Sequence, residues 1–199
     1  TGWFTPVHVR SDASDRLRSL ISARERLIRL RIDLEGYVRG ALKTFGIRMT
    51  AVTRGRQRQA FRDQLAAAGE TDPVLRVVAD SFITTHATLC KAAAELDAII
   101  QKQAARHPVA KRLMTIPGVG PVVALSFVAL IDDPDRFRRT SDVGAFLGLT
   151  PRRHQSGEMD WSGRISKCGD RAMRGLLVQA ASCVLRQIGR FSALKSWAV

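Results

Sequence analysis

Residues 116–121 read Ile116-Pro-Gly-Val-Gly-Pro121 and lie between two apolar segments. Glycine accepts backbone angles that other residues resist, and proline disfavours the interior of a helix. We therefore expect a tight turn over residues 117–120, with a short helix at 109–114 before it and an apolar helix at 122–130 after it. This unit predicts an α-helical fold for the region around it.

Two helices joined by a turn of this kind are typical of a helix-hairpin-helix, a motif that contacts the DNA backbone. Gly118 and Gly120 would let the turn approach a phosphate closely, while Ile116 and Val119 would anchor it in the core. Amides at the start of the next helix would then face the anion. Such contacts position DNA without reading its sequence. The alternative is a buried corner whose glycines serve only close packing.

The rest of the C-terminal half predicts further helices. His107-Pro108 breaks the preceding pattern, residues 132–135 read as a turn, and Thr140-Ser141-Asp142 begins a helix that ends near Gly148. Residues 150–169 read as a loop rich in glycine, serine and arginine. A final helix is expected over residues 170–187, with these residues facing inward: Met173, Leu177, Ala180, Ala181, Val184 and Ile188.

The N-terminal half predicts a long helical hairpin. Residues 11–14 offer N-caps for a first helix whose apolar stripe reaches Ala41, although Arg24 and Arg31 interrupt it. Residues 46–56 are polar and contain glycine, and Arg48, Arg54, Arg56 and Arg58 lie close together, as expected of a basic loop at the tip of the hairpin. A short helix through residues 61–65 then stops at Gly69, since a glycine readily ends a helix.

A second long helix begins at Pro73, because Thr71-Asp72-Pro73 combines an N-cap with proline in the first turn. A seam of mostly apolar residues then recurs at spacings of 3 and 4: Leu75, Val78, Phe82, Thr85, Leu89, Ala92, Leu96 and Ile99. This coiled-coil-like seam closes either within one chain or between chains, and we expect a homo-oligomer, a dimer or a tetramer. The predicted fold is all-α, with no strand after residue 10.

The expected loop at residues 150–169 concentrates cations around serines. Its basic residues are Arg152, Arg153, His154, Arg164 and Lys167, and its serines are Ser156, Ser162 and Ser166. A serine that attacks a phosphodiester must lose its proton, and the charge developing on the phosphate must be stabilised. Arginines can stabilise that charge. The nearby bases are His154, Glu158 and Asp160, and spacing does not choose between them. A purely structural serine is the alternative, and Ser166 is expected to cap a turn into the final helix.

The composition agrees with a polyanionic partner. The 199 residues include 32 Lys and Arg against 18 Asp and Glu, a net charge of +14, and the pI is near 11.2. Both halves carry the excess, +6 over residues 1–105 and +8 over residues 106–199. No apolar run has the length of a membrane span, and no signal peptide is recognised. Three widely spaced cysteines, Cys90, Cys168 and Cys183, fit a reducing cytosol.

No metal site is expected in this chain. His8, His86 and His107 lack partners at metal-ligand spacing. Asp132, Asp133 and Asp135 form an acidic cluster, but Asp-Asp-Pro-Asp is more simply a turn and a helix start.

Residues 110–199 resemble the C-terminal domain of an insertion-sequence transposase family, whose members join it to an N-terminal RuvC-like domain and of which some use a bridge RNA as guide. The resemblance rests on motifs that occur in order: Ile116-Pro-Gly-Val-Gly-Pro121, Asp135-Arg-Phe137, Phe146-Leu-Gly-Leu-Thr-Pro151, Arg153-His-Gln-Ser-Gly157, Ile165-Ser-Lys-Cys-Gly169 and Arg171. Residues 1–12 resemble the end of the RuvC-like domain and residues 13–105 its helical hairpin, ahead of a helix-hairpin-helix domain at residues 106–199.

The resemblance implies a DNA transposase or recombinase that cuts and rejoins DNA. Ser156 aligns with the serine that attacks DNA and forms a phosphoserine link, and the DEDD carboxylates that bind Mg²⁺ would lie upstream of Thr1. We therefore expect a fragment, inactive alone, of a prokaryotic cytoplasmic protein associated with the nucleoid.

The expected partner is DNA, with a guide RNA as a second candidate. The expected DNA contacts are Gly118, Val119, Gly120, Arg152, Arg153, Arg164, Lys167 and Arg171, of which Arg152 and Arg153 would hold the scissile phosphate. The alternative function is a non-enzymatic DNA- or RNA-binding module with a dimerising helical hairpin.

Overall fold

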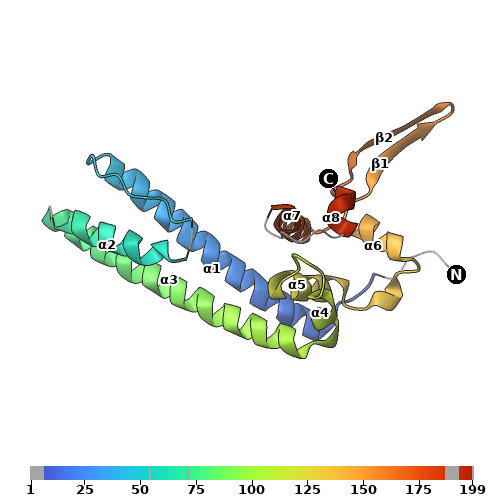
Figure 1. The fold of residues 1–199 in the computed structure, drawn as a ribbon, viewed down its shortest axis with the longest axis horizontal. Helices are drawn as coiled ribbons and strands as arrows, with labels where there is room; N and C mark the ends of the chain where they lie inside the picture. The colour runs from blue at the N-terminus through green and yellow to red at the C-terminus, as the bar shows by residue number, and fades with distance from the viewer. Residues whose placement is uncertain (1–6, 54, 71, 187–192, 199) are drawn as a thin grey trace. The chain divides into compact units, whose positions relative to one another are not determined.

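The computed structural model describes residues 7–53, 55–70, 72–186 and 193–198, and its fold is mainly α-helical, as the sequence predicts (Figure 1). Two compact units are formed, one by Leu20–Ile99 and the other by Thr1–Ser19 with Ile100–Val199. The expected domain boundaries at residues 12 and 105 stay a prediction. Among the described residues, no helix has the length and apolar character needed to cross a membrane.

The first unit is a helical hairpin. The long helices are α1 (Asp12–Lys43) and α3 (Pro73–Arg106), and the shorter α2 (Gln57–Gly69) lies between them in sequence. Asp72 caps α3 by accepting hydrogen bonds from the amides of Val74 and Leu75. The predicted start of α3 is therefore confirmed, and the described residues 47–53 form a loop between α1 and α2. Its apolar core gathers residues from all three elements: Val38, Leu42, Met49, Phe61, Leu65, Ala68 and Ala79.

The predicted seam of α3 is wrong at Val78, Thr85 and Ile99, which are exposed. Ala79, His86 and Ala93 are buried, whereas Val78 and Thr85, one residue earlier, are exposed. The prediction followed the larger apolar side chains, but two alanines and a histidine are buried instead. Leu75, like the other seam residues at heptad spacing from it, is half-buried as expected.

The side chains of Glu35, His86 and Arg62 form a connected set of hydrogen bonds inside this unit. The ring of His86 is 0% exposed; its Nε2 lies 3.0 Å from Glu35 Oε1 and its Nδ1 lies 3.2 Å from Arg62 Nη1. Because a guanidinium can only donate, Nδ1 accepts and Nε2–H donates to Glu35. Burial is the main cause that lowers the pKa of His86. Arg31, which interrupts the predicted stripe, lies 3.8 Å from the same carboxylate, and Arg24 pairs with Asp97.

The second unit packs short helices around a separate apolar core. Its elements are α4 (Pro108–Leu113), α5 (Pro121–Ile131), the 3₁₀ turn η1 (Pro134–Arg136), α6 (Thr140–Phe146), α7 (Arg171–Arg186) and α8 (Ala193–Ala198). Leu130, Leu147 and Met173 are buried together. The inward face of α7 is confirmed at Met173, Ala180 and Val184, but Ala181 is exposed. Ile188 lies outside the described residues.

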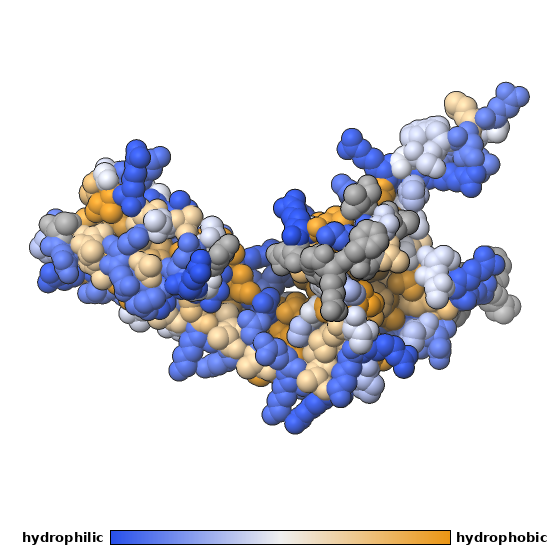
Figure 2. Space-filling view, viewed as in Figure 1, coloured by the Kyte–Doolittle hydropathy of each residue, from blue (hydrophilic) through white to orange (hydrophobic). Residues whose placement is uncertain are grey.

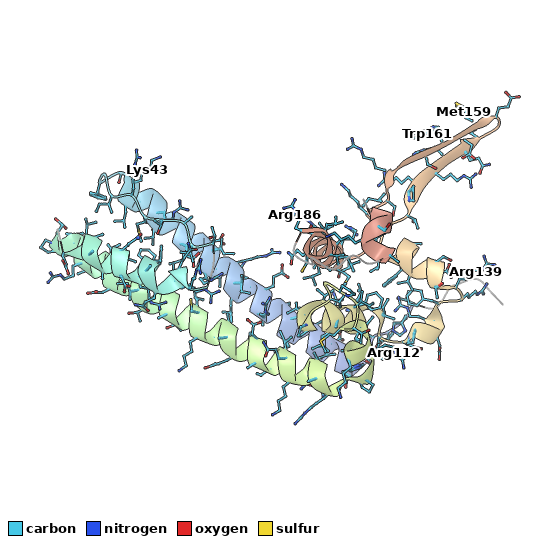
Figure 3. The ribbon with its side chains drawn as sticks, in the orientation of Figure 1. Lys43, Arg112, Arg139, Met159, Trp161 and Arg186 are labelled. Carbon is cyan, nitrogen blue, oxygen red and sulfur yellow. The ribbon has the colours of Figure 1, made fainter. Side chains whose placement is uncertain are left out.

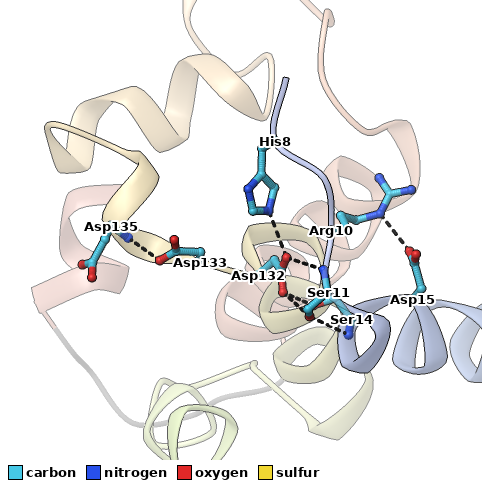
Figure 4. Close-up of polar contacts among 8 residues, drawn as sticks. All are labelled: His8, Arg10, Ser11, Ser14, Asp15, Asp132, Asp133 and Asp135. Atoms are coloured by element: carbon cyan, nitrogen blue, oxygen red, sulfur yellow. Dashed lines mark hydrogen bonds and ion pairs between the residues drawn. The ribbon is translucent and has the colours of Figure 1, made fainter. Parts of the chain in front are cut away.

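Asp132 ties the N-terminal segment to the end of α5 (Figure 4). Its carboxylate accepts hydrogen bonds from the amide and hydroxyl of Ser11 at 2.8 and 2.6 Å, from the hydroxyl of Ser14 at 2.6 Å and from His8 Nε2 at 2.9 Å. The bonds from Ser11, followed by that from Ser14, hold the pKa of Asp132 well below its usual range. Asp133 caps η1 through the amide of Asp135. These contacts support a structural turn rather than a metal site.

The segment expected to be a loop at residues 150–169 is instead a β-hairpin. Strands β1 (Pro151–Ser156) and β2 (Met159–Ile165) pair antiparallel, with a register shift between Pro151 and Arg153. The sequence carries the two signals of such a hairpin. Met159, Trp161 and Ile165 alternate with polar residues, and Gly157 stands in the two-residue turn at φ +55°. The loop prediction gave weight to glycine and serine content and missed this alternation.

Candidate nucleic-acid interface

The hairpin brings Ser156 to its tip. Ser156 is the last residue of β1, pairs with Met159 across the turn, and is exposed. All of β1 and nearly all of β2 are exposed, and the visible face of the hairpin is mostly hydrophilic (Figure 2). Accessibility is what a nucleophile for a large substrate requires, so the local fold is compatible with attack on DNA.

One face of the hairpin is occupied by an ion pair. Arg153 binds both carboxylate oxygens of Asp160, with its Nε 2.9 Å from Oδ1. This contact holds the pKa of the Asp160 carboxyl below its ordinary value and raises the pKa of Arg153. Asp160 is therefore a poor proton acceptor, and Arg153 already has an anionic partner. Ser162, directly opposite Arg153 in the register, lies on this face.

The other face carries His154, Ser156 and Trp161. Alternate residues of a strand share a face, so His154 and Ser156 point the same way. The rings of His154 and Trp161 stack across the strands, with centroids 4.0 Å apart and planes inclined by 12°. Figure 3 labels Trp161 and Met159 along the hairpin. Of the three bases that the sequence leaves open, His154 is therefore the one that shares the face of the serine.

The base of the hairpin is fixed by two glycines. A Cβ on Gly148 would lie 2.6 Å from the amide nitrogen of Cys168, and one on Gly169 would lie 2.2 Å from the carbonyl oxygen of Phe146. This close crossing holds residues 166–169 against the end of α6. The amides of Ser166 and Lys167 donate to the carbonyls of Thr150 and Gly148. Lys167 adopts φ +58°, a left-handed conformation that is uncommon outside glycine.

Ser166 is predicted to cap a turn leading into the final helix, and the cap of helix α7 (Arg171–Arg186) itself is a different residue. Asp170 performs that role, since its carboxylate accepts from the amide of Met173 at 2.8 Å. The carbonyl of Ser166 instead accepts from Arg152 Nη2 at 3.2 Å. The side chains of Arg164, Lys167 and Arg171 are exposed and engage no acceptor among the described residues. They are the cations of this region that remain available to a phosphate.

The turn at residues 117–120 assigns different roles to its two glycines. Gly118 has φ +83°, and a Cβ there would lie 2.5 Å from the carbonyl oxygen of Ala180 in α7. Gly118 therefore serves close packing, the alternative that the sequence allows. Gly120 is the N-cap of α5, and a Cβ there would meet nothing within 4 Å. Ile116 is 43% exposed, so it does not anchor the turn in the core, whereas Val119 is half-buried.

Sequence reasoning overlooked Trp161 and the pairing role of Asp160. Trp161 falls in the segment that the sequence predicts to be a loop, where a single aromatic residue gives no periodic pattern. The alternation of residues 159–165 was the available signal, because it places Trp161 on one face with His154 opposite.

Comparison with known proteins places this domain among transposases. Residues 110–195 match the family model described as the Transposase IS116/IS110/IS902 family. The chain is 32% identical over 187 residues to a probable family 20 transposase of Pseudomonas aeruginosa. This alignment covers 90% of this chain and 54% of the relative. It is 31% identical over 183 residues to the transposase for insertion sequence element IS1111A of Coxiella burnetii, covering 90% of this chain and 50% of the relative.

The matches to these relatives extend well beyond residues 110–195 into the helical hairpin, although the chain spans only about half of their length. Residues 110–195 are therefore similar to the IS116/IS110/IS902 family of transposases, and most of the chain is similar to proteins named as transposases.

Proposed function

We propose that this chain is the DNA-binding and serine-bearing portion of a transposase that cuts and rejoins DNA. The observation that carries the proposal is the position of Ser156, exposed at the tip of a hairpin in a transposase-like domain, with exposed cations toward the base of the same hairpin. The net charge of +14 supports a nucleic-acid partner. The relatives are named as transposases, which supports the same class of activity.

In the proposed reaction, Ser156 Oγ attacks a phosphorus atom of one DNA strand. A bond forms between Oγ and phosphorus, the bond to a deoxyribose oxygen breaks, and the strand is left joined to the protein as a phosphoserine. Attack by a hydroxyl of another strand on that link would rejoin DNA and release the serine. With Asp160 held by Arg153, the bases that remain for the serine proton are His154, on the same face as the serine, and the exposed Glu158 in the turn.

The DNA backbone would be held by cations toward the base of the hairpin, whereas Ser156 lies opposite Met159 at its tip. Arg164, Lys167 and Arg171 are exposed and unengaged among the described residues, and Arg152 is tied only to a backbone carbonyl. Magnesium would supply Lewis-acid chemistry, but the described residues include no group of three His, Cys, Asp or Glu side chains that could hold it. Its ligands would have to come from outside this part of the chain, as the resemblance implies.

The decisive experiment uses the complete transposase that carries this chain, a labelled DNA junction and Mg²⁺. Ser156→Ala should abolish the covalent protein–DNA adduct and leave DNA binding nearly unchanged. Ser162→Ala is the matched control, because it removes a hydroxyl from the opposite face of the same hairpin, and it should retain the adduct. An adduct that persists in Ser156→Ala would overturn the assignment.

DNA binding by the chain itself is tested separately. Counterion release predicts an affinity that falls steeply with salt and shows little sequence preference. Binding that is absent at low salt, or insensitive to salt, would contradict the proposal. Salt-sensitive binding together with an unreactive Ser156 would instead support the non-enzymatic binding module. An RNA duplex and a guide-like RNA are included as competitors, because a guide RNA is the second proposed partner.

A further inference from the structure

The stacked pair of His154 and Trp161 leaves one large aromatic surface facing solvent. Trp161 is 54% exposed on a hairpin that has no apolar core of its own. A cross-strand ring pair contributes to hairpin stability, which accounts for one face of the indole. It does not account for a tryptophan whose remaining surface stays in water, since exposed aromatic surface is more typical of a binding site.

The stacked pair lines a shallow groove that is otherwise basic. The groove has a volume of about 340 Å³ and is lined by Arg152, His154, Trp161, Gly163, Arg164, Ile165, Ser166 and Lys167. No carboxylate lines it, because Asp160 and its partner Arg153 are on the opposite face. An aromatic platform beside three cations matches the two parts of a nucleotide, a flat base and an anionic phosphate.

Glycines lie next to both Trp161 and Lys167. Gly163 keeps the groove open next to the indole, since a Cβ there would touch Trp161 Cζ3 at 3.4 Å. Lys167 is held in its left-handed conformation by the crossing of Gly148 and Gly169. Backbone strain of this kind persists where the surroundings enforce it, and it is concentrated at ligand sites. Lys167 is one of the residues that line the groove.

We propose that this groove binds an unpaired nucleotide, with the base stacked on Trp161 and the phosphate held by Arg164 and Lys167. The inference rests on the proposed function, which supplies the nucleic-acid partner, and it specifies in addition that the bound nucleotide of this partner is unpaired. A base within a duplex is covered on both faces by its neighbours, so only an unpaired or extruded base offers a face to an indole. Because Ser156 shares this face of the hairpin, the bound nucleotide would lie near the phosphate to be attacked.

The test compares the present chain on two DNA duplexes of equal length, one fully paired and one with a single unpaired 2-aminopurine. Affinity is measured by fluorescence anisotropy, and stacking by the emission of 2-aminopurine. The wild type should bind the unpaired form about fivefold or more tightly and quench its emission, since stacking on one side chain contributes roughly 1–3 kcal/mol. A single-stranded RNA of the same sequence shows whether the groove distinguishes sugars.

Three variants separate stacking from folding. Trp161→Ile keeps strand propensity but removes the ring, and it should lose both the preference and the quenching. Trp161→Phe should keep part of both. Tyr37→Ala removes another exposed ring, 63% exposed in the helical hairpin, and should leave both unchanged.

Equal affinity of the wild type for the two duplexes would overturn the proposal while leaving the DNA-binding function intact. Retained preference in Trp161→Ile would also overturn it. Absence of any DNA binding would remove the proposed function together with this inference.

Discussion

Gly118 and Gly120 are two residues apart, yet the structure gives them opposite sensitivities to substitution. Gly118 adopts φ +83°, and a Cβ would lie 2.5 Å from the carbonyl oxygen of Ala180 and 2.9 Å from Val184 Cγ2. Both contacts are with α7, whose backbone cannot move without disturbing the core around Met173. Gly118→Ala therefore adds backbone strain and overpacking at the same point.

The magnitude follows from these two terms. A non-glycine residue held at positive φ costs roughly 1 kcal/mol or more, and overpacking a well-packed interface costs about 1–3 kcal/mol. Gly118→Ala should therefore lower the free energy of unfolding by about 3 kcal/mol. Gly120→Ala, with φ −95° and open space around the new Cβ, should change it by less than about 1 kcal/mol.

The assay is urea unfolding followed by circular dichroism, with amide hydrogen exchange of α5 and α7 to separate the two units, because each unit can unfold by itself. A Gly118→Ala protein within about 0.5 kcal/mol of the wild type would refute the packing argument. Because substitutions at Gly118 are expected to destabilise the protein, the DNA contact of the turn is tested at Gly120. Gly120→Val should remain folded but bind DNA more weakly, since its side chain blocks approach to the first turn of α5.

The remaining predictions concern stability, pH and assembly. Asp132→Asn should lower the free energy of unfolding by about 2 kcal/mol at pH 7 through lost charged hydrogen bonds. Because the pKa of Asp132 is depressed, this difference should begin to shrink as pH falls below the ordinary value of 3.8 and should be lost only at the much lower pH at which Asp132 is protonated in the folded protein. His86 has a lowered pKa, so stability should fall as pH drops below 6.5, and His86→Gln should flatten that dependence in unfolding experiments. The double variant Val74→Asp and Val78→Asp, with both changes at exposed positions of α3, should reduce self-association measured by sedimentation. If the wild type already sediments as a monomer, the seam of α3 closes within one chain.

Local signals in the sequence predict the helices of this chain well. Asp72 with Pro73 defines the start of α3, and the apolar run after Pro121 defines α5. These features act over a few residues, so they are legible without the tertiary structure. The basic loop before α2 is predictable for the same reason.

Features that depend on distant partners were not predictable. The burial of His86 depends on Glu35 and Arg62, which are 51 and 24 residues away. The role of Asp132 depends on Ser11 and Ser14, more than one hundred residues earlier. A polar residue is buried only where such partners satisfy it, and spacing along one helix does not reveal them. The seam of α3 was misassigned on that account.

The hairpin itself explains why the candidate serine needs its substrate. Two-stranded hairpins are marginally stable in water, and this one is held by the Arg153–Asp160 pair, the His154–Trp161 stack and the glycine crossing at its base. None of these restraints packs against Ser156 at the tip. Productive catalysis needs the reacting groups held within about 0.5 Å of their working geometry. A nucleotide stacked on Trp161 would fix the hairpin and the scissile phosphate against each other in one step. The serine would then become reactive only when DNA occupies the groove, and accessible serine alone would not cut.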